Sequence, residues 1–252
     1  MEIFCSIVVY AGLLAAFLGF VSILKPIKRL GIASRRRGAI VFVCGIAAVF
    51  IAFILPARET RIASVESQLD GFMPAYQFHE FHSIRVHASR EKVFQALKEV
   101  RADEIFLFRT LTWIRRFGRP GPESILNAPE RMPILEVATR TTFLLLAEEA
   151  NCEIVVGTLV AAPAGWHPHG ERTVEGFLKL RAPGFALAAM NFRLEDAGAN
   201  ETVLTTETRV YATDASARRR FAPYWRTIFP GSALIRVMWL RAVKNRAERE
   251  PR

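Results

Sequence analysis

Histidines are the residues of this chain most able to bind a metal ion or to move a proton. Two of them lie in the segment Trp166-His167-Pro168-His169, and His79, His82 and His87 lie close together further upstream. Successive side chains of a β-strand point to opposite faces, so a strand would separate His82 from His79 and His87. Zinc would also need further Cys or His ligands at suitable spacing. We therefore expect no metal site and interpret these histidines as surface or rim residues.

Carboxylates are the second group with possible chemistry. Glu148, Glu149 and Glu153 flank a predicted hairpin, and Glu207 lies two residues before Arg209 in a predicted strand. A carboxylate and an arginine on one strand face most simply form an ion pair on the sheet surface. The alternative is a buried Glu207 with a raised pKa that acts as a general base. The sequence identifies no catalytic residue.

Two long apolar runs occupy the N-terminal part of the chain. Residues 3–24 and 39–55 contain no charged side chain. A helix needs roughly 20 apolar residues to span a bilayer, and lipid tolerates no open backbone group. The first run begins after Glu2 and ends in Leu24-Lys25-Pro26, which does not fit a cleaved signal peptide. We therefore predict two transmembrane helices within residues 1–55.

The segment between the two runs is strongly basic. Short loops rich in Lys and Arg stay on the cytoplasmic side of a membrane. We therefore expect residues 25–37 to be cytoplasmic, and the N-terminus and the large soluble part to lie on the other side. In a bacterium, this places the protein in the inner membrane with its soluble domain in the periplasm. The basic residues of this loop are Lys25, Lys28, Arg29, Arg35, Arg36 and Arg37.

The net charge does not indicate a nucleic-acid partner. Residues 1–55 account for half of the formal net charge of +10. Nucleic-acid binding would require a clustered basic face with interleaved aromatic residues, and the only basic clusters we identify in the remainder are Arg218-Arg219-Arg220 and the C-terminal helix. We interpret the basic charge as a solvated or membrane-facing surface.

The soluble part shows the pattern of an α+β domain. Residues 56–76 are expected to be a linker with about one helical turn, and residues 77–252 a single domain. Strand-like and helix-like periods then follow one another along the chain, which indicates an antiparallel sheet with helices gathered on one face. The predicted strands are 77–87, 141–149, 152–160, 185–195 and 201–211. The predicted helices are one with Ser89 as its N-cap, one over 102–117, and a long last helix over 216–249 with an interruption at 229–231.

Two stretches of this domain resemble a known family. The first is Ser83-Ile84-Arg85-Val86-His87, followed by Ala88-Ser89-Arg90-Glu91-Lys92-Val93-Phe94-Gln95-Ala96-Leu97. The second runs from Thr206 to Asp214 and continues with Phe221, Tyr224-Trp225, Pro230-Gly231-Ser232, Ile235-Arg236 and Trp239-Leu240. With the order of the elements, they resemble the START-like superfamily, also called SRPBCC or polyketide cyclase/dehydrase-like, over roughly residues 77–248.

The resemblance implies a helix-grip fold, in which a curved antiparallel sheet wraps around the long C-terminal helix and encloses a cavity. It implies no universal catalytic residue, so none is carried over to this chain. We also expect no cofactor. A solid core would use the same apolar residues, but His82 is polar on an otherwise apolar face, as in ligand sites. The expected cavity lining is Phe78, His82, Ile84, Val86, Met190, Phe192, Leu194, Leu234, Ile235 and Met238.

These patterns together lead to one main expectation about function. A bilayer-anchored domain of this kind would bind a hydrophobic small molecule or lipid, and the membrane would keep it close to its ligand. One alternative is a START-like enzyme of the cyclase or hydrolase type, which would need convergent titratable groups in the cavity. Another is a non-catalytic scaffold that contacts a further membrane protein and carries an exposed apolar patch.

Overall fold

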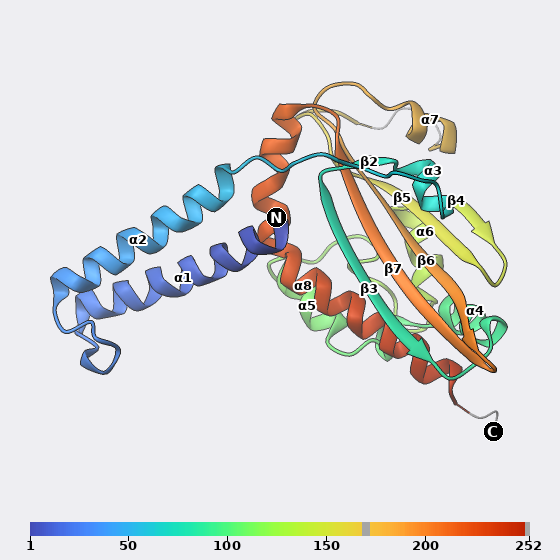
Figure 1. Ribbon diagram of the computed structural model, residues 1–252, viewed down its shortest axis with the longest axis horizontal. Coiled ribbons are helices and arrows are strands. Elements are labelled where there is room, and N and C mark those ends of the chain that lie inside the picture. Colours follow the sequence, from blue (N-terminus) through green and yellow to red (C-terminus); the bar gives the residue numbers. More distant parts are fainter. Residues whose placement is uncertain (168–171, 250–252) are drawn as a thin grey trace. The chain divides into compact units, whose positions relative to one another are not determined.

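The computed structural model describes residues 1–167 and 172–249 (Figure 1). Its contacts divide the chain into two compact units. The first unit contains residues 1–58 and 218–230, and the second contains residues 59–217 and 231–252. The long last helix, α8 (Ala215–Ala247), therefore contributes to both units.

The first unit is built on a helical hairpin. Helices α1 (Glu2–Leu24) and α2 (Arg35–Ile54) lie side by side and are joined by the short 3₁₀ helix η1 (Lys28–Leu30) (Figure 1). Both helices are long and apolar enough to cross a membrane. Their large apolar side chains are mostly exposed, whereas small residues dominate the buried faces. The buried residues of α2 are Gly38, Gly45 and Ala52. After the first turns of α1, its buried residues are Val9, Gly12, Ala16, Gly19 and Ser22.

Glycines bring the two backbones of the hairpin close together. A Cβ atom added at Gly19 would lie 2.3 Å from the backbone nitrogen of Phe42, and one added at Gly45 would lie 2.5 Å from that of Ala16. Small residues of this kind are typical of helix pairs in lipid, where close packing replaces the hydrophobic effect.

One buried arginine ties residues 218–230 to the hairpin. The Arg226 guanidinium donates two hydrogen bonds of 2.9 Å to the two carboxylate oxygens of Glu2, at the start of α1. It also donates one of 2.5 Å to the carbonyl of Ala52, near the end of α2. Because a buried charge is costly unless it is paired, this bidentate geometry accounts for an arginine with no exposed surface.

The second unit contains a five-stranded antiparallel sheet, as the sequence predicted. The strand order is β3-β7-β6-β5-β4. The strands are β3 (Phe78–Val86), β4 (Leu144–Glu149), β5 (Glu153–Ala161), β6 (Ala186–Gly198) and β7 (Glu201–Ala212). A separate two-stranded sheet joins β1 (Thr60–Arg61) to β2 (Ala75–Tyr76).

The main hydrophobic core lies on one face of this sheet. Helices α4 (Arg90–Glu99) and α6 (Ile134–Thr141) pack there, together with the part of α8 that follows residue 230. We call this side of the sheet the α8 face. The Phe192 and Trp239 rings, from β6 and α8, have their centroids 4.9 Å apart in this core.

The opposite side of the sheet, the α3 face, is also covered. Helices α3 (Gln68–Phe72) and α7 (Val174–Lys179) belong to a smaller cluster with Leu146, Val155 and Leu187. The expectation that helices gather on one face was therefore wrong for these two short helices. The segment 56–76, expected as a linker, is instead packed on the domain from α3 onward, because fully buried Leu69 and a Ser67–Asp70 capping box fix that helix.

Three other elements differ from their predictions. The predicted helix over 102–117 is a 3₁₀ turn, η2 (Ala102–Glu104), followed by α5 (Phe108–Arg115). Helix α6, which the sequence did not predict, reaches into the start of the strand predicted at residue 141. Helix α8 is continuous through Pro230. A proline inside a helix removes one backbone hydrogen bond, and the buried contacts of Arg226 before it and Trp239 after it offset that loss.

Candidate functional site

A polar cluster interrupts the apolar α8 face of the sheet. The Glu80 side chain, on β3, is almost fully buried, and its carboxylate is the centre of the cluster. One carboxylate oxygen lies 2.8 Å from Nε2 of His82, and the other accepts a hydrogen bond of 3.0 Å from the Ser232 hydroxyl on α8. The buried carboxylate therefore holds a histidine and a serine in fixed positions between strand and helix.

Arg236 adds a positive charge to this cluster. It follows Ser232 by one helical turn, so both side chains lie on the same side of α8. Burial lowers the pKa of Arg236; the negative charge of Glu80 partly offsets this, and the positive charge of Arg115 on α5 adds to it. Within the described residues, Arg236 forms no ion pair; its guanidinium lies 5.7 Å from the centroid of the Trp239 ring.

Most residues expected to line a cavity are brought together on the α8 face. Val86, Met190, Phe192, Leu194 and Met238 belong to the main core, and Ile84 and Ile235 pack against it. Phe78 is fully buried, whereas Leu234 is 37% exposed and does not belong to this core. The two pockets described below are lined by other residues.

The sequence reasoning missed three members of the polar cluster. Glu80 lies on the same strand face as Phe78 and His82, so the alternation of β3 already placed it inward. Ser232 and Arg236 are spaced one helical turn apart and precede buried Trp239 on α8. In both β3 and α8, a polar residue within an apolar stripe was the sequence feature that could have identified these residues.

The α3 face carries a second charged network, in which Arg209 is central. Its guanidinium lies 2.7 Å from Asp70 and 2.6 Å from Glu207, and Nε2 of His79 lies 2.9 Å from Glu207. Burial alone would raise the pKa of Glu207, but the hydrogen bonds from His79 and Arg209 outweigh it and leave that pKa below its ordinary value. The predicted Glu207–Arg209 ion pair is thus present, and the pKa of Glu207 is lowered, not raised as the general-base alternative required.

The other predicted chemical groups have structural roles or remain undescribed. The buried Glu153 carboxylate accepts hydrogen bonds from the Asn191 amide and from the backbone N–H of Gln68, which fixes α3. Glu148 pairs with Lys98 at 2.5 Å. Pro168 and His169 lie outside the described residues. In the part of the chain that the structure describes, no three His, Cys, Asp or Glu side chains are placed to hold a metal ion.

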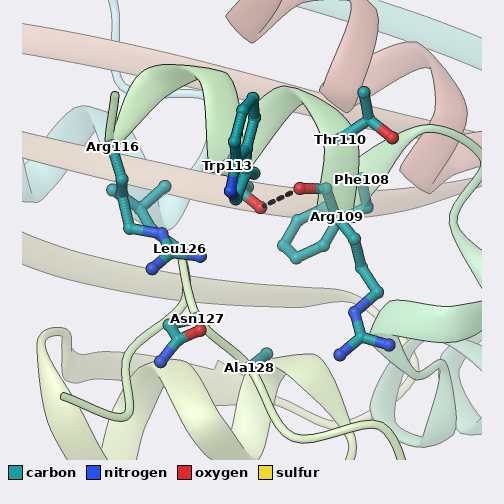
Figure 2. Close-up of a pocket in the computed structure, with 9 residues that line it drawn as sticks. Phe108, Arg109, Thr110, Trp113, Arg116, Leu126, Asn127 and Ala128 are labelled. Atoms are coloured by element: carbon teal, nitrogen blue, oxygen red, sulfur yellow. Dashed lines mark hydrogen bonds between the residues drawn. The ribbon is translucent and has the colours of Figure 1, made fainter. Parts of the chain in front are cut away.

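A pocket of about 360 Å³ lies between α5 and the segment 126–128 (Figure 2). Arg109 and Trp113 of α5, and Arg116 directly after it, lie along one side, and Asn127 and Ala128 lie opposite (Figure 2). Its volume is in the range of small-molecule sites. A smaller pocket of about 260 Å³ lies on the α3 face, where Phe72, Phe177 and Tyr211 contribute to its wall.

Comparisons with known proteins leave the family of this chain open. No family model matches it, and no curated protein does. A hypothetical protein, jhp0584, from Helicobacter pylori matches over 74% of this chain and 97% of its own, with 9% sequence identity and a TM-score of 0.35. The Zhui aromatase/cyclase from Streptomyces sp. R1128 matches over 68% of this chain and 94% of its own, with 16% identity and a TM-score of 0.26. Similarity at this level says nothing about what the chain binds or catalyses.

Proposed function

We propose that this chain is a membrane-anchored protein with a START-like, helix-grip domain that binds a hydrophobic small molecule or lipid between its sheet and α8. In this proposal α1 and α2 cross a bacterial inner membrane and keep the domain next to an apolar ligand, which partitions into the bilayer. The five-stranded sheet and the long helix packed on it support the helix-grip assignment.

The observation that carries the proposal is the polar cluster on the α8 face. Ligand sites are mostly apolar, with a few polar groups placed to orient the ligand. Arg236 is a partly buried cation without an ion pair in the described structure, and Ser232 lies one helical turn away. A guanidinium of this kind is suited to a carboxylate or phosphate. We therefore propose an apolar ligand with an acidic end, held by Arg236 near His82 and Ser232.

The test uses the full chain purified in detergent from a bacterial host. Native mass spectrometry and lipid extraction should detect a co-purifying apolar acid in near-stoichiometric amount. A fluorescent long-chain fatty acid should then bind saturably, and Arg236→Met should weaken its binding at least about tenfold, since one charge-assisted contact is lost.

Arg193→Met is the matched control, because Arg193 pairs with Glu195 and alternates along β6 with the core residues Phe192 and Leu194, so it lies on the opposite face of the sheet from the cluster. It should leave binding unchanged. The thermal unfolding of both variants should be recorded, so that lost binding is read only from folded protein. A full chain that carries no apolar molecule and shows no saturable binding would overturn the proposal.

A START-like enzyme of the cyclase or hydrolase type is the second candidate. The Glu80–His82 contact favours it, because an imidazole held in place by a carboxylate has the arrangement used in general acid–base catalysis. The variant His82→Gln distinguishes ligand binding from catalysis, because it removes the imidazole and keeps a polar side chain. If the wild-type chain converts the extracted ligand into a new product and the variant binds it unchanged, the domain is an enzyme.

A further inference from the structure

Helix α5 and its flanks carry a group of exposed large apolar side chains. We call residues 105–119 the α5 segment. Phe117 is 89% exposed and Trp113 is 57% exposed, and Phe106 and Ile114 are also exposed. Trp113 and Ile114 belong to the last turn of α5, and Phe117 follows two residues after the helix ends, so all three lie at its C-terminal end. Such side chains are costly in water unless another surface covers them.

Backbone geometry holds these side chains outward. Leu107, immediately before α5, and Phe117, shortly after it, both have left-handed backbone angles, with φ of 58° and 53°. This conformation is unfavourable for residues other than glycine, and strain of this kind collects at functional positions. The Trp113 ring packs against Gly118, where an added Cβ would lie 2.9 Å from it. The exposure of Phe117 is therefore a feature of the turn that ends α5.

The same segment is basic and borders the pocket of Figure 2. Arg109 and Arg116 line the pocket, and Arg119 is exposed close by. Arg109 pairs with Glu130, whereas the Nε group of Arg116 is buried without a hydrogen-bond acceptor in the described structure. The pocket wall also contains the Thr110 hydroxyl and that of Thr112, which donates to the Arg109 carbonyl at 3.2 Å. A phosphate would find several hydrogen-bond donors and positive charge here.

We propose that the α5 segment docks on the bilayer surface and that the adjoining pocket binds the phosphate group of an anionic phospholipid. Basic residues interleaved with Trp and Phe are typical of helices that lie in the interface of a membrane. The aromatic rings enter the boundary of the acyl chains, and the arginines meet the anionic headgroups. This inference rests on the membrane anchorage of the proposed function and does not depend on ligand binding at Arg236.

Hydrogen–deuterium exchange of the full chain in nanodiscs tests the docking surface. The nanodiscs contain phosphatidylcholine alone, or phosphatidylcholine with one-third phosphatidylglycerol. Amides of residues 105–128 should exchange roughly tenfold more slowly with phosphatidylglycerol present, because the basic residues are attracted to the anionic surface and the docked segment is shielded from water. The double variant Arg109→Ala, Arg116→Ala and the single variant Phe117→Ser should each lose this protection.

Two control variants replace an arginine and a phenylalanine that are also exposed but lie outside the α5 segment. Arg85→Ala removes an arginine exposed to 61% and paired with Glu201, comparable with Arg109 at 62%. Phe81→Ser removes an exposed phenylalanine from β3. Both should keep the protection of residues 105–128. Equal exchange in the two nanodiscs, or equal losses in the controls, would overturn the docking surface, while bound ligand in the same preparation would leave the proposed function standing.

Discussion

Arg209 is the residue on which the α3 face depends most. Its guanidinium forms ion pairs with Asp70 and Glu207. It also lies over the Tyr76 ring, 5.0 Å from the ring centroid. Burial alone would raise the pKa of Asp70, but hydrogen bonds from the backbone of Glu66, from Arg209 and from Ser67 leave it below its ordinary value. Two carboxylates whose pKa values fall on folding make the stability of the second unit sensitive to acid.

The free energy of unfolding should therefore fall as the pH is lowered. The pKa of Glu207 is lower in the folded chain than its ordinary value of 4.5, so the unfolded chain binds more protons. This carboxylate therefore stabilises the fold at pH values above 4.5. The stabilisation is lost as the pH falls through the pKa of the folded state. Urea unfolding of the full chain in detergent at a series of pH values should show a loss below about pH 4.5. The loss should be smaller in Glu207→Gln.

Glu175→Gln is a suitable control for that experiment. It removes an exposed carboxylate that pairs with Lys179 on the surface of α7, so the pH profile of stability should match the wild type. A Glu207→Gln variant with the wild-type slope would show that another carboxylate governs the acid response.

The sequence predicted the roles of individual residues correctly where their pattern allowed a single structural interpretation. The Glu207–Arg209 pair followed from strand spacing alone, and the apolar residues of β6 were assigned to the sheet face that holds the main core. Glu80 was overlooked, because a carboxylate is rarely buried and its partner Ser232 lies 152 residues away in the chain. Contacts over such separations depend on the folded sheet and not on local sequence.

At the scale of elements, the close packing of α1 against α2 depends on glycines, which have no side chain, where the two helices meet. Gly19→Ala should weaken it, because the new Cβ would lie 2.3 Å from the backbone of Phe42 and force the helices apart. We expect a loss of about 1–3 kcal/mol, as for other overpacked contacts. Thermal unfolding of the full chain in detergent should show the loss as a lower midpoint temperature.

Gly231→Ala is the matched control for the hairpin. Gly231 lies inside α8, and nothing would meet a Cβ atom added there. Alanine favours a helix over glycine by up to about 1 kcal/mol, so this variant should be as stable as the wild type or more stable. A Gly19→Ala chain that unfolds like the Gly231→Ala chain would contradict the close-packed hairpin.

The elements that sequence failed to predict share a physical cause. Helix α6 is rich in Ile, Val and Thr, which favour strands when isolated, and its contacts with α4 decide in favour of a helix. Helix α8 has two internal prolines that locally predict breaks, but buried residues on either side of Pro230 keep it continuous. Tertiary packing overrode local preference in both helices, whereas strand β3 formed where the alternation of its residues predicted it.

At the scale of the whole molecule, the proposed topology is open to a direct experiment. In a variant without Cys5, Cys44 and Cys152, single cysteines are introduced as Lys28→Cys in the basic loop and Val65→Cys, which is exposed in the second unit. In intact bacterial spheroplasts, a membrane-impermeant maleimide should label the second variant and not the first, because basic loops remain cytoplasmic. The reverse labelling would place the domain in the cytoplasm.

The pairing of β3 with β7 also determines when the domain can fold. His79 and Glu207, neighbours across these two strands, are 128 residues apart in the chain. At about 5–20 residues per second, a ribosome needs on the order of ten seconds to make the intervening chain. During that interval β3, at the edge of the sheet, has no strand to pair with. Newly made chains should therefore depend on a chaperone that shields this first strand until the last one is synthesised.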